Sequence, residues 1–263
     1  MNFTIAAAQI AVRRGDVAGN VAAHTEAIVA AAAAGASLVV FPELSLTGYE
    51  PDLAASLAFT ADDVRLADLQ HLAARHQITL SVGAPVRNPS AGSDGEAVGK
   101  PAIGAFVISP AGIRTYLKMH LGTTEAPYFS TGETPLMVQI ADQRCGIAIC
   151  ADSSRASHPE TYSDLGAGIY AAGVFFNDAW YGEDAPRLQR YAAELGMLVV
   201  MANHGASTGT LVSAGGSTIW APGGEVLAQA NGTDSALVMA TKTADRWQGS
   251  VRTIEPVLGF SGA

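Results

Sequence analysis

The sequence is poor in charged residues and in cysteine, and each shortage excludes a class of protein. Charged side chains make up 15% of the 263 residues, and the formal net charge is −9. A negative chain repels phosphate backbones, so nucleic acid is not expected as a partner. The two cysteines, Cys145 and Cys150, fall on one predicted strand and point to opposite faces, so they cannot easily bond to each other. We therefore expect a reducing, cytoplasmic location.

Long apolar runs and targeting segments are lacking as well. No run of about 18 apolar residues occurs, so a membrane span is not expected. The N-terminus has no basic region before an apolar one, which argues against a secretory signal. The six histidines lack the close spacing of metal ligands, and Gly215-Gly216 precedes a predicted strand rather than a helix. Neither a metal nor a phosphate-bearing cofactor is therefore expected.

The chain is instead rich in apolar residues arranged in short, regular segments. Hydrophobic residues make up 49% and the mean hydropathy is +0.22, enough for a large core. Helix, glycine and apolar strand follow one another around Gly35, Gly173 and Gly196, mixed with hairpins, and no linker interrupts residues 1–263. This pattern predicts one α/β domain with two sheets and helices outside, although composition alone fits a doubly wound sheet equally well.

Several element boundaries are specific enough to be tested. Asn20 is a plausible N-cap for a helix that ends near residue 34, before Gly35. Residues 185–195 are predicted to be a helix that ends at Gly196, and residues 173–177 a strand that ends just before Trp180. A strand at 235–239 is the last that the pattern indicates.

Three chemically active side chains each end an apolar strand and begin a loop: Glu43, Lys118 and Cys150. Chemistry in open α/β folds collects outside the carboxyl ends of strands. A carboxylate can take the proton of a thiol, and an ammonium can stabilise the thiolate and an oxyanion, with the N–H of Ala151 as a second oxyanion donor. Taken singly, each has an ordinary interpretation: a turn carboxylate, a solvated strand-end cation, and a small buried hydrophobe.

The segments around these residues form a recognisable set. Residues 41–49 contain Glu43, residues 116–121 contain Lys118, and residues 146–152 contain Cys150. Later landmarks are Asn203, Gly205, Gly216-Ser217 and residues 222–226. In order and spacing the set resembles the nitrilase superfamily of carbon–nitrogen hydrolases, on its amidase-like branch.

This resemblance implies a four-layer α-β-β-α sandwich, assembled as a homodimer or larger homo-oligomer. It implies Glu43 as general base, Lys118 as the oxyanion-stabilising cation and Cys150 as nucleophile, with no cofactor. Glu125 lies where many members have a second glutamate, which would orient Lys118, the substrate or the attacking water. The alternative for Glu125 is a surface-loop carboxylate.

The sequence departs from the common family pattern directly after the nucleophile. Many amidase-like members have an aromatic residue there, followed by Asp and soon Arg, Phe and Pro. Here Ala151 follows, Asp152 fits, and Arg155 and Pro159 lie late. His158 in this loop is interpreted as solvated rather than as a contact for a substrate carboxylate, and His120 as structural.

Three further residues are predicted to line the substrate pocket: Tyr49, Asn177 and Trp180. The main functional hypothesis is a cysteine-dependent hydrolase that cleaves the C–N bond of a small linear amide through a thioester on Cys150, releasing ammonia or an amine. A nitrilase or an N-carbamoyl amidohydrolase would use the same residues, and a non-catalytic scaffold is the least favoured interpretation. Because true nitrilases commonly have Cys-Trp-Glu, the sequence favours amides over nitriles.

Overall fold

The computed structural model describes residues 3–88, 99–244 and 246–254 of the chain, which form helices, helical turns and strands. The helices and helical turns are α1 Val17–Ala33, η1 Pro51–Leu53, α2 Ala54–Leu57, η2 Val64–Leu66, α3 Ala67–His76, η3 Cys150–Ser154, α4 Ser157–Asp164 and α5 Asp178–Leu195. The strands are β1 Phe3–Gln9, β2 Leu38–Val40, β3 Thr79–Val86, β4 Ala102–Ser109, β5 Gly112–Leu117, β6 Met137–Ile140, β7 Gln143–Ile149, β8 Ile169–Gly173, β9 Leu198–Ala202, β10 Thr218–Trp220, β11 Val226–Gln229, β12 Ala236–Thr243 and β13 Arg246–Thr253.

The strands form two mixed sheets. The seven-stranded sheet has the order β13-β12-β1-β2-β3-β4-β5, and the six-stranded sheet has the order β11-β10-β9-β8-β7-β6. In each sheet the middle strands are parallel, namely β1, β2 and β3 in one and β7, β8 and β9 in the other. The outer strands join by antiparallel pairing, as the predicted hairpins require.

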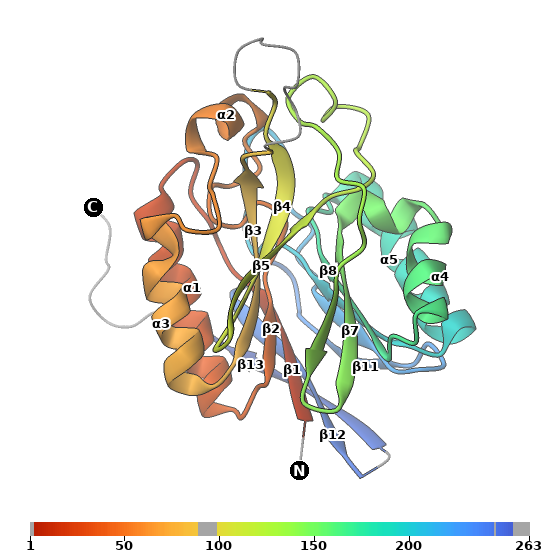
Figure 1. The fold of residues 1–263 in the computed structure, drawn as a ribbon. Coiled ribbons are helices and arrows are strands. Elements are labelled where there is room, and N and C mark those ends of the chain that lie inside the picture. The colour runs from red at the N-terminus through yellow and green to blue at the C-terminus, as the bar shows by residue number, and fades with distance from the viewer. Residues whose placement is uncertain (1–2, 89–98, 245, 255–263) are drawn as a thin grey trace.

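Three separate hydrophobic cores show how the layers stack. One core joins the inner faces of the two sheets, with Ile5 and Leu38 from one and Ile147 and Leu198 from the other. A second core packs α1 and α3 on the outer face of the seven-stranded sheet. A third packs α4 and α5 on the outer face of the six-stranded sheet. Figure 1 shows the resulting order of helices, sheet, sheet and helices, which confirms the predicted four-layer sandwich.

The first helix begins differently from the prediction. Asp16, not Asn20, is its N-cap, because the Asp16 side chain accepts a hydrogen bond from the Gly19 N–H. Asn20 is buried within the helix, and its amide donates to the carbonyls of Arg13 and Leu46. Asn20 therefore ties the helix to the loop that follows β2. The predicted end at Gly35 is confirmed, since that glycine has a φ of 78°.

Two further boundaries were predicted wrongly. The strand expected at 173–177 is β8, which ends at Gly173 because its parallel partners β7 and β9 end opposite that residue. The helix expected at 185–195 begins at residue 178, because the Asn177 side chain accepts from the Trp180 N–H and caps it. Trp180 thus lies in a first helical turn and not at a strand end.

The prediction also omitted β13, the edge strand of the seven-stranded sheet. It pairs with β12 along its whole length, from Thr243 opposite Arg246 to Ala236 opposite Thr253. Almost all of its residues are exposed, so it lacks the alternation of buried and exposed positions that indicates a strand. No helix in the described ranges is long and apolar enough to cross a membrane.

Candidate active site

Lys118 lies at the centre of a buried cluster of charges. Its ammonium donates to Glu43 Oε1 at 2.6 Å and to both carboxylate oxygens of Glu125 at 2.8 Å. All three side chains are at most 3% exposed. The interpretation of Glu125 as a surface-loop carboxylate is therefore wrong. Its side chain is withdrawn from water, and its charge is balanced by the Lys118 ammonium instead. The sequence predicted these three residues, and the fold brings them together.

The strand ends hold the cluster from both sheets. Glu43 and Lys118 follow β2 and β5 of the seven-stranded sheet, whereas Cys150 follows β7 of the six-stranded sheet. Cys150 itself has a φ of 42°, and Leu44 after Glu43 has a φ of 52°. Residues other than glycine seldom adopt this left-handed backbone, and such strain collects at functional sites.

Two glycines let the main chain around Glu43 fit between the sheets. A Cβ on Gly83 of β3 would collide with the carbonyl oxygen of Pro42. A Cβ on Gly173, the last residue of β8, would collide with the carbonyl oxygen of Phe41. The segment before the carboxylate is therefore packed against backbone from both sheets, a contact between distant segments that the sequence analysis missed.

His204 also holds this segment and was overlooked. It is fully buried after β9, and its Nε2 lies 2.7 Å from the carbonyl oxygen of Glu43, to which it donates. Burial lowers the pKa of His204 to about 4, so the ring is neutral at physiological pH. The only available signal was its position between the landmarks Asn203 and Gly205.

Cys150 is the one member of the group that is partly exposed, while Cys145 is fully buried in the core between the sheets. The Sγ of Cys150 lies 3.9 Å from the carbonyl oxygen of Phe175. Burial and the charge of Glu43 raise the pKa of the Cys150 thiol well above its ordinary value, and Lys118 opposes this only in part. Cys150 therefore rests as a thiol, which would need a base in order to react as a nucleophile.

The electrostatics make Glu43 suited to act as that base. Burial raises its pKa to about 7, the Lys118 ammonium opposes the rise, and Glu125 adds to it. Burial works against a charged Lys118, but Glu43, Cys150 and Glu125 together raise the pKa of the ammonium, so it stays protonated. Glu43 Oε2 is buried without a hydrogen-bond partner in the described part of the chain, while Oε1 is used by Lys118.

Tyr49 joins the cluster by its hydroxyl group. It donates to Glu125 Oε1 at 2.7 Å, and its ring stacks on Phe175 with the centroids 5.2 Å apart. The carbonyl of that phenylalanine faces the Cys150 thiol. Tyr49 thus lies within the group, as expected of a wall of the pocket; whether it contacts substrate stays a prediction.

The candidate oxyanion donor lies in the turn that begins at Cys150. Cys150 begins the 3₁₀ turn η3, and the N–H of Ala151 precedes the first N–H that such a turn can bond internally. It is therefore available for a developing negative charge next to the thiol. The role of Ala151 remains a prediction.

Two of the predicted pocket residues do not join the cluster in this way. Asn177 uses its side-chain oxygen to cap α5, at 3.0 Å from the Trp180 N–H. Trp180 itself is 47% exposed. No contact of either side chain with the charged cluster emerges from the geometry, and their place in the pocket stays a prediction.

The loop after the nucleophile is more ordered than the sequence indicated. His158 is 4% exposed and hydrogen-bonds the hydroxyls of Tyr116 and Tyr170, so the prediction of a solvated histidine is wrong. The helix α4 begins at Ser157 and turns the ring inward. Asp152 is fully buried beside it. His120 packs edge-on against His158, in keeping with a structural role.

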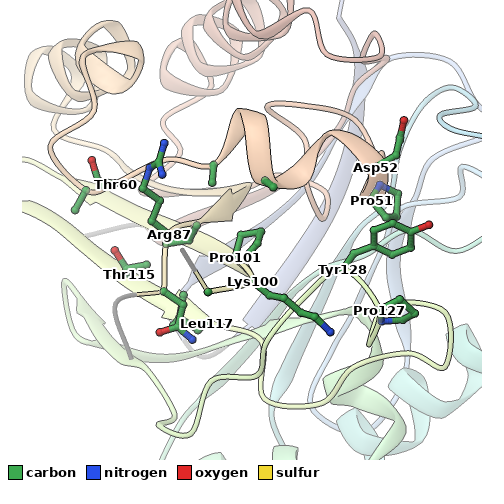
Figure 2. A pocket seen from close by; sticks show the side chains of 16 residues that line it. Pro51, Asp52, Thr60, Arg87, Lys100, Pro101, Thr115, Leu117, Pro127 and Tyr128 are labelled. Carbon is green, nitrogen blue, oxygen red and sulfur yellow. The ribbon is translucent and has the colours of Figure 1, made fainter. Parts of the chain in front are cut away.

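A large cavity in the described part of the chain lies apart from the cluster. It measures about 1160 Å³ and is lined by residues such as Arg87, Lys100, Leu117 and Tyr128 (Figure 2). None of the four acidic, basic and thiol residues described above lines it. Within the described ranges, no group of three or more His, Cys, Asp and Glu side chains is arranged to hold a metal ion.

Comparison with known proteins identifies the class that this fold and cluster define. Residues 4–250 match the carbon–nitrogen hydrolase family. The chain therefore belongs to the carbon–nitrogen hydrolase family, which confirms the resemblance to the nitrilase superfamily.

Solved structures and a curated sequence relative extend the comparison. The NitN amidase from Nesterenkonia sp. AN1 is 24% identical, with a TM-score of 0.78 over 91% of each chain. A variant of that amidase with acrylamide added at its active site cysteine is 23% identical, with a TM-score of 0.79 over 93% of this chain and 94% of the other. The glutamine-dependent NAD(+) synthetase of Thermotoga maritima is 33% identical over 168 residues, which are 62% of this chain and 28% of that protein. The chain thus spans less than a third of the length of that relative.

Proposed function

We propose that this protein hydrolyses the C–N bond of a small linear amide through a thioester on Cys150. The observation that carries the proposal is the buried ammonium of Lys118, held by Glu43 and Glu125 near a partly exposed cysteine. A fixed cation and a carboxylate of raised pKa are what a protonated thiol needs to attack a neutral carbonyl.

The first half-reaction forms the acyl-enzyme. Glu43 takes the thiol proton on Oε2, the oxygen that Lys118 leaves free. The sulfur attacks the amide carbon, and the carbonyl electrons move to oxygen, where the Lys118 ammonium and the Ala151 N–H stabilise them. The C–N bond then breaks as Glu43 returns the proton to nitrogen, so that ammonia or an amine leaves and a thioester remains.

The second half-reaction uses the same groups in reverse. Glu43, again a carboxylate, takes a proton from water as the water oxygen attacks the thioester carbon. The oxyanion forms between the same donors, the C–S bond breaks, and the proton returns to sulfur. A carboxyl group with a pKa of about 7 can act as base and as acid in turn near neutral pH.

Glu125 is proposed to hold Lys118 in place and to carry part of its countercharge. Both of its oxygens accept from Lys118, one accepts from the Tyr49 hydroxyl, and the other from the Gly122 N–H at 2.6 Å. Glu125 thus accepts four hydrogen bonds from three donor groups, so it is less free than Glu43 to exchange protons. It therefore suits orientation better than proton transfer.

Substrate choice is argued from the residue after the nucleophile and from the relatives. Ala151 replaces the tryptophan of the common Cys-Trp-Glu segment, which favours amides over nitriles. The solved relatives are named amidases. The curated relative is named for its dependence on glutamine, so the side-chain amide of glutamine is a second candidate substrate. Nitriles and N-carbamoyl compounds remain the alternatives.

The test is the intact mass of the protein after incubation with saturated amides, glutamine, a nitrile and an N-carbamoyl amino acid. Acrylamide is left out because its double bond adds to the cysteine of the Nesterenkonia variant. Wild type should release ammonia and, when quenched with acid during turnover, show a mass gain of one acyl group on Cys150, whereas Glu43→Gln, which lacks the base for the thiol, should release none. Cys150→Ala is the control that should show neither. No adduct and no ammonia with any compound would refute the proposal, and turnover by Cys150→Ala would refute the thioester.

The release pattern separates the alternatives. Ammonia together with carbon dioxide would assign an N-carbamoyl amidohydrolase, and consumption of a nitrile but not of its amide would assign a nitrilase. Assembly as a homodimer or larger oligomer and a cytoplasmic location are also proposals. Light scattering during size-exclusion chromatography tests the first, and fractionation of the source cells tests the second.

A further inference from the structure

Asp152 is a buried carboxylate with four donors and no role in the reaction described above. Its Oδ1 accepts from the N–H groups of Met119 at 3.0 Å and His120 at 2.9 Å. Its Oδ2 accepts from the N–H of Ile149 at 3.0 Å and the hydroxyl of Tyr116 at 2.7 Å. The side chain is fully buried, so these four donors replace the water that a carboxylate would otherwise bind.

The donors lie next to the reacting residues in both sheets. Met119 and His120 directly follow Lys118 at the end of β5, and Ile149 directly precedes Cys150 at the end of β7. One carboxylate therefore fixes the main chain after the cation and before the nucleophile. Because Cys150 has a left-handed backbone, its conformation must be held by its surroundings, and the bond to Ile149 is one such restraint.

A chain of hydroxyl and imidazole groups leads away from this carboxylate. The Tyr116 hydroxyl has one proton, which it donates to Asp152, so its 2.9 Å contact with His158 Nε2 requires an N–H on the histidine. His158 Nδ1 is then an acceptor, and the Tyr170 hydroxyl at 2.9 Å donates to it. Every proton points toward Asp152, in the order Tyr170, His158, Tyr116.

The two tyrosines and the histidine of this hydrogen-bonded series keep the same protonation over a wide pH range. Burial and the charge of Asp152 raise the pKa values of Tyr116 and Tyr170. Burial lowers the pKa of His158, although Asp152 opposes the change, so the ring is neutral. The hydrogen-bonded series from Tyr170 through His158 to Tyr116 is therefore a fixed set of dipoles near neutral pH.

We propose that Asp152 and His158 are positioning residues, which set the place of Lys118 relative to Cys150 without touching substrate. This rests on the proposed function. An error of about 1 Å in the placement of reacting groups can lower a rate by about a hundredfold, so a restraint on both strand ends acts on the chemical step rather than on substrate binding.

The test compares variants that differ in hydrogen bonding but little in size. His158→Phe keeps a ring and loses both hydrogen bonds, whereas His158→Gln supplies an N–H and a carbonyl in place of the two ring nitrogens. Asp152→Asn replaces one of the two carboxylate oxygens by an N–H₂ group. That group cannot accept the two hydrogen bonds that the oxygen accepted. Tyr162→Phe is the matched control: it removes two buried hydrogen bonds, to Ile147 and Leu136, that do not include Asp152.

Two readouts are measured with each variant. The first is kcat and KM on the amide that wild type cleaves. The second is the rate at which iodoacetamide alkylates Cys150, followed by intact mass, with Cys150→Ala to exclude Cys145. The melting temperature reports loss of stability. The alkylation rate needs no natural substrate, so it decides this inference even if no amide is turned over and the proposed function fails.

The expected result is a fall of about tenfold in kcat and in the alkylation rate for His158→Phe, with KM changed less than about twofold. His158→Gln should recover most of both rates, and Asp152→Asn should lose more than His158→Phe. Tyr162→Phe should lower the melting temperature while leaving both rates within about twofold of wild type. Equal rates for His158→Phe and wild type, or equal losses for His158→Gln and His158→Phe, would overturn the proposal.

Discussion

The free energy of unfolding should depend on pH through Glu43, and the Glu43→Gln variant isolates this contribution. The folded state raises the pKa of Glu43 from 4.5 to about 7, mainly by burial. Between these two values the folded protein holds a proton that the unfolded chain has released. The stability that this proton provides is complete below about pH 4.5 and is lost as the pH rises through about 7.

The size of the effect follows from the pKa difference. Each pKa unit corresponds to about 1.4 kcal/mol, so a shift from 4.5 to about 7 makes the folded state about 3 kcal/mol less stable at pH 8 than at pH 4.5. Two buried histidines act in the opposite direction. Burial lowers the pKa values of His24 and His204 to about 4, so their contribution to stability is lost as the pH falls from about 6.5 to about 4.

The assay is urea unfolding of wild type and Glu43→Gln at intervals from pH 5 to pH 8. Subtracting one free energy of unfolding from the other removes the histidines, which both proteins contain. Glu43→Gln should gain on wild type as the pH rises, by about 2 to 3 kcal/mol over this range. A difference that stays constant within about 0.5 kcal/mol would refute the raised pKa of Glu43.

The remaining predictions concern activity and packing. The kcat/KM of wild type should fall about tenfold per pH unit below about pH 7, because Glu43 must be a carboxylate to take the thiol proton; a profile flat to pH 5 would contradict this assignment. Cys150→Ala should abolish turnover. Cys145→Ala, in the core between the sheets, should retain its activity per folded molecule, and its free energy of unfolding in urea should fall by about 1 to 3 kcal/mol. Gly173→Ala should lower activity and the melting temperature because its Cβ meets the main chain before the base, while Gly182→Ala, which has nothing within 4 Å of its Cβ, should behave as wild type in the same two assays.

The charged cluster was predictable from sequence because strand ends and motif order converge on the same three residues. Glu43, Lys118 and Cys150 each follow an apolar run, and a strand end fixes where a side chain lies more closely than a loop does. Glu125 required the family pattern, since nothing in its own loop indicates that a carboxylate there is buried. The stacking of four layers also came from the resemblance, because composition left a second architecture open.

The supports of the cluster were not predictable in this way. Gly83, Gly173 and His204 act on Glu43 through its main chain, and such contacts depend on how the sheets dock rather than on any local pattern. Asn177 and Trp180 were assigned to the end of a strand rather than to the start of α5, because the cap that begins α5 lies several residues before its predicted start. His158 was taken for a loop residue because its burial depends on hydroxyls from β5 and β8.

The division of the cluster between two sheets has a consequence for the folding of the protein. Glu43 and Lys118 come from the seven-stranded sheet and Cys150 from the six-stranded sheet, so neither half can assemble the set by itself. During refolding from urea, each sheet can gain secondary structure before the two faces meet. Turnover should then return only when the two sheets dock, so the recovery of activity reports the last step of folding.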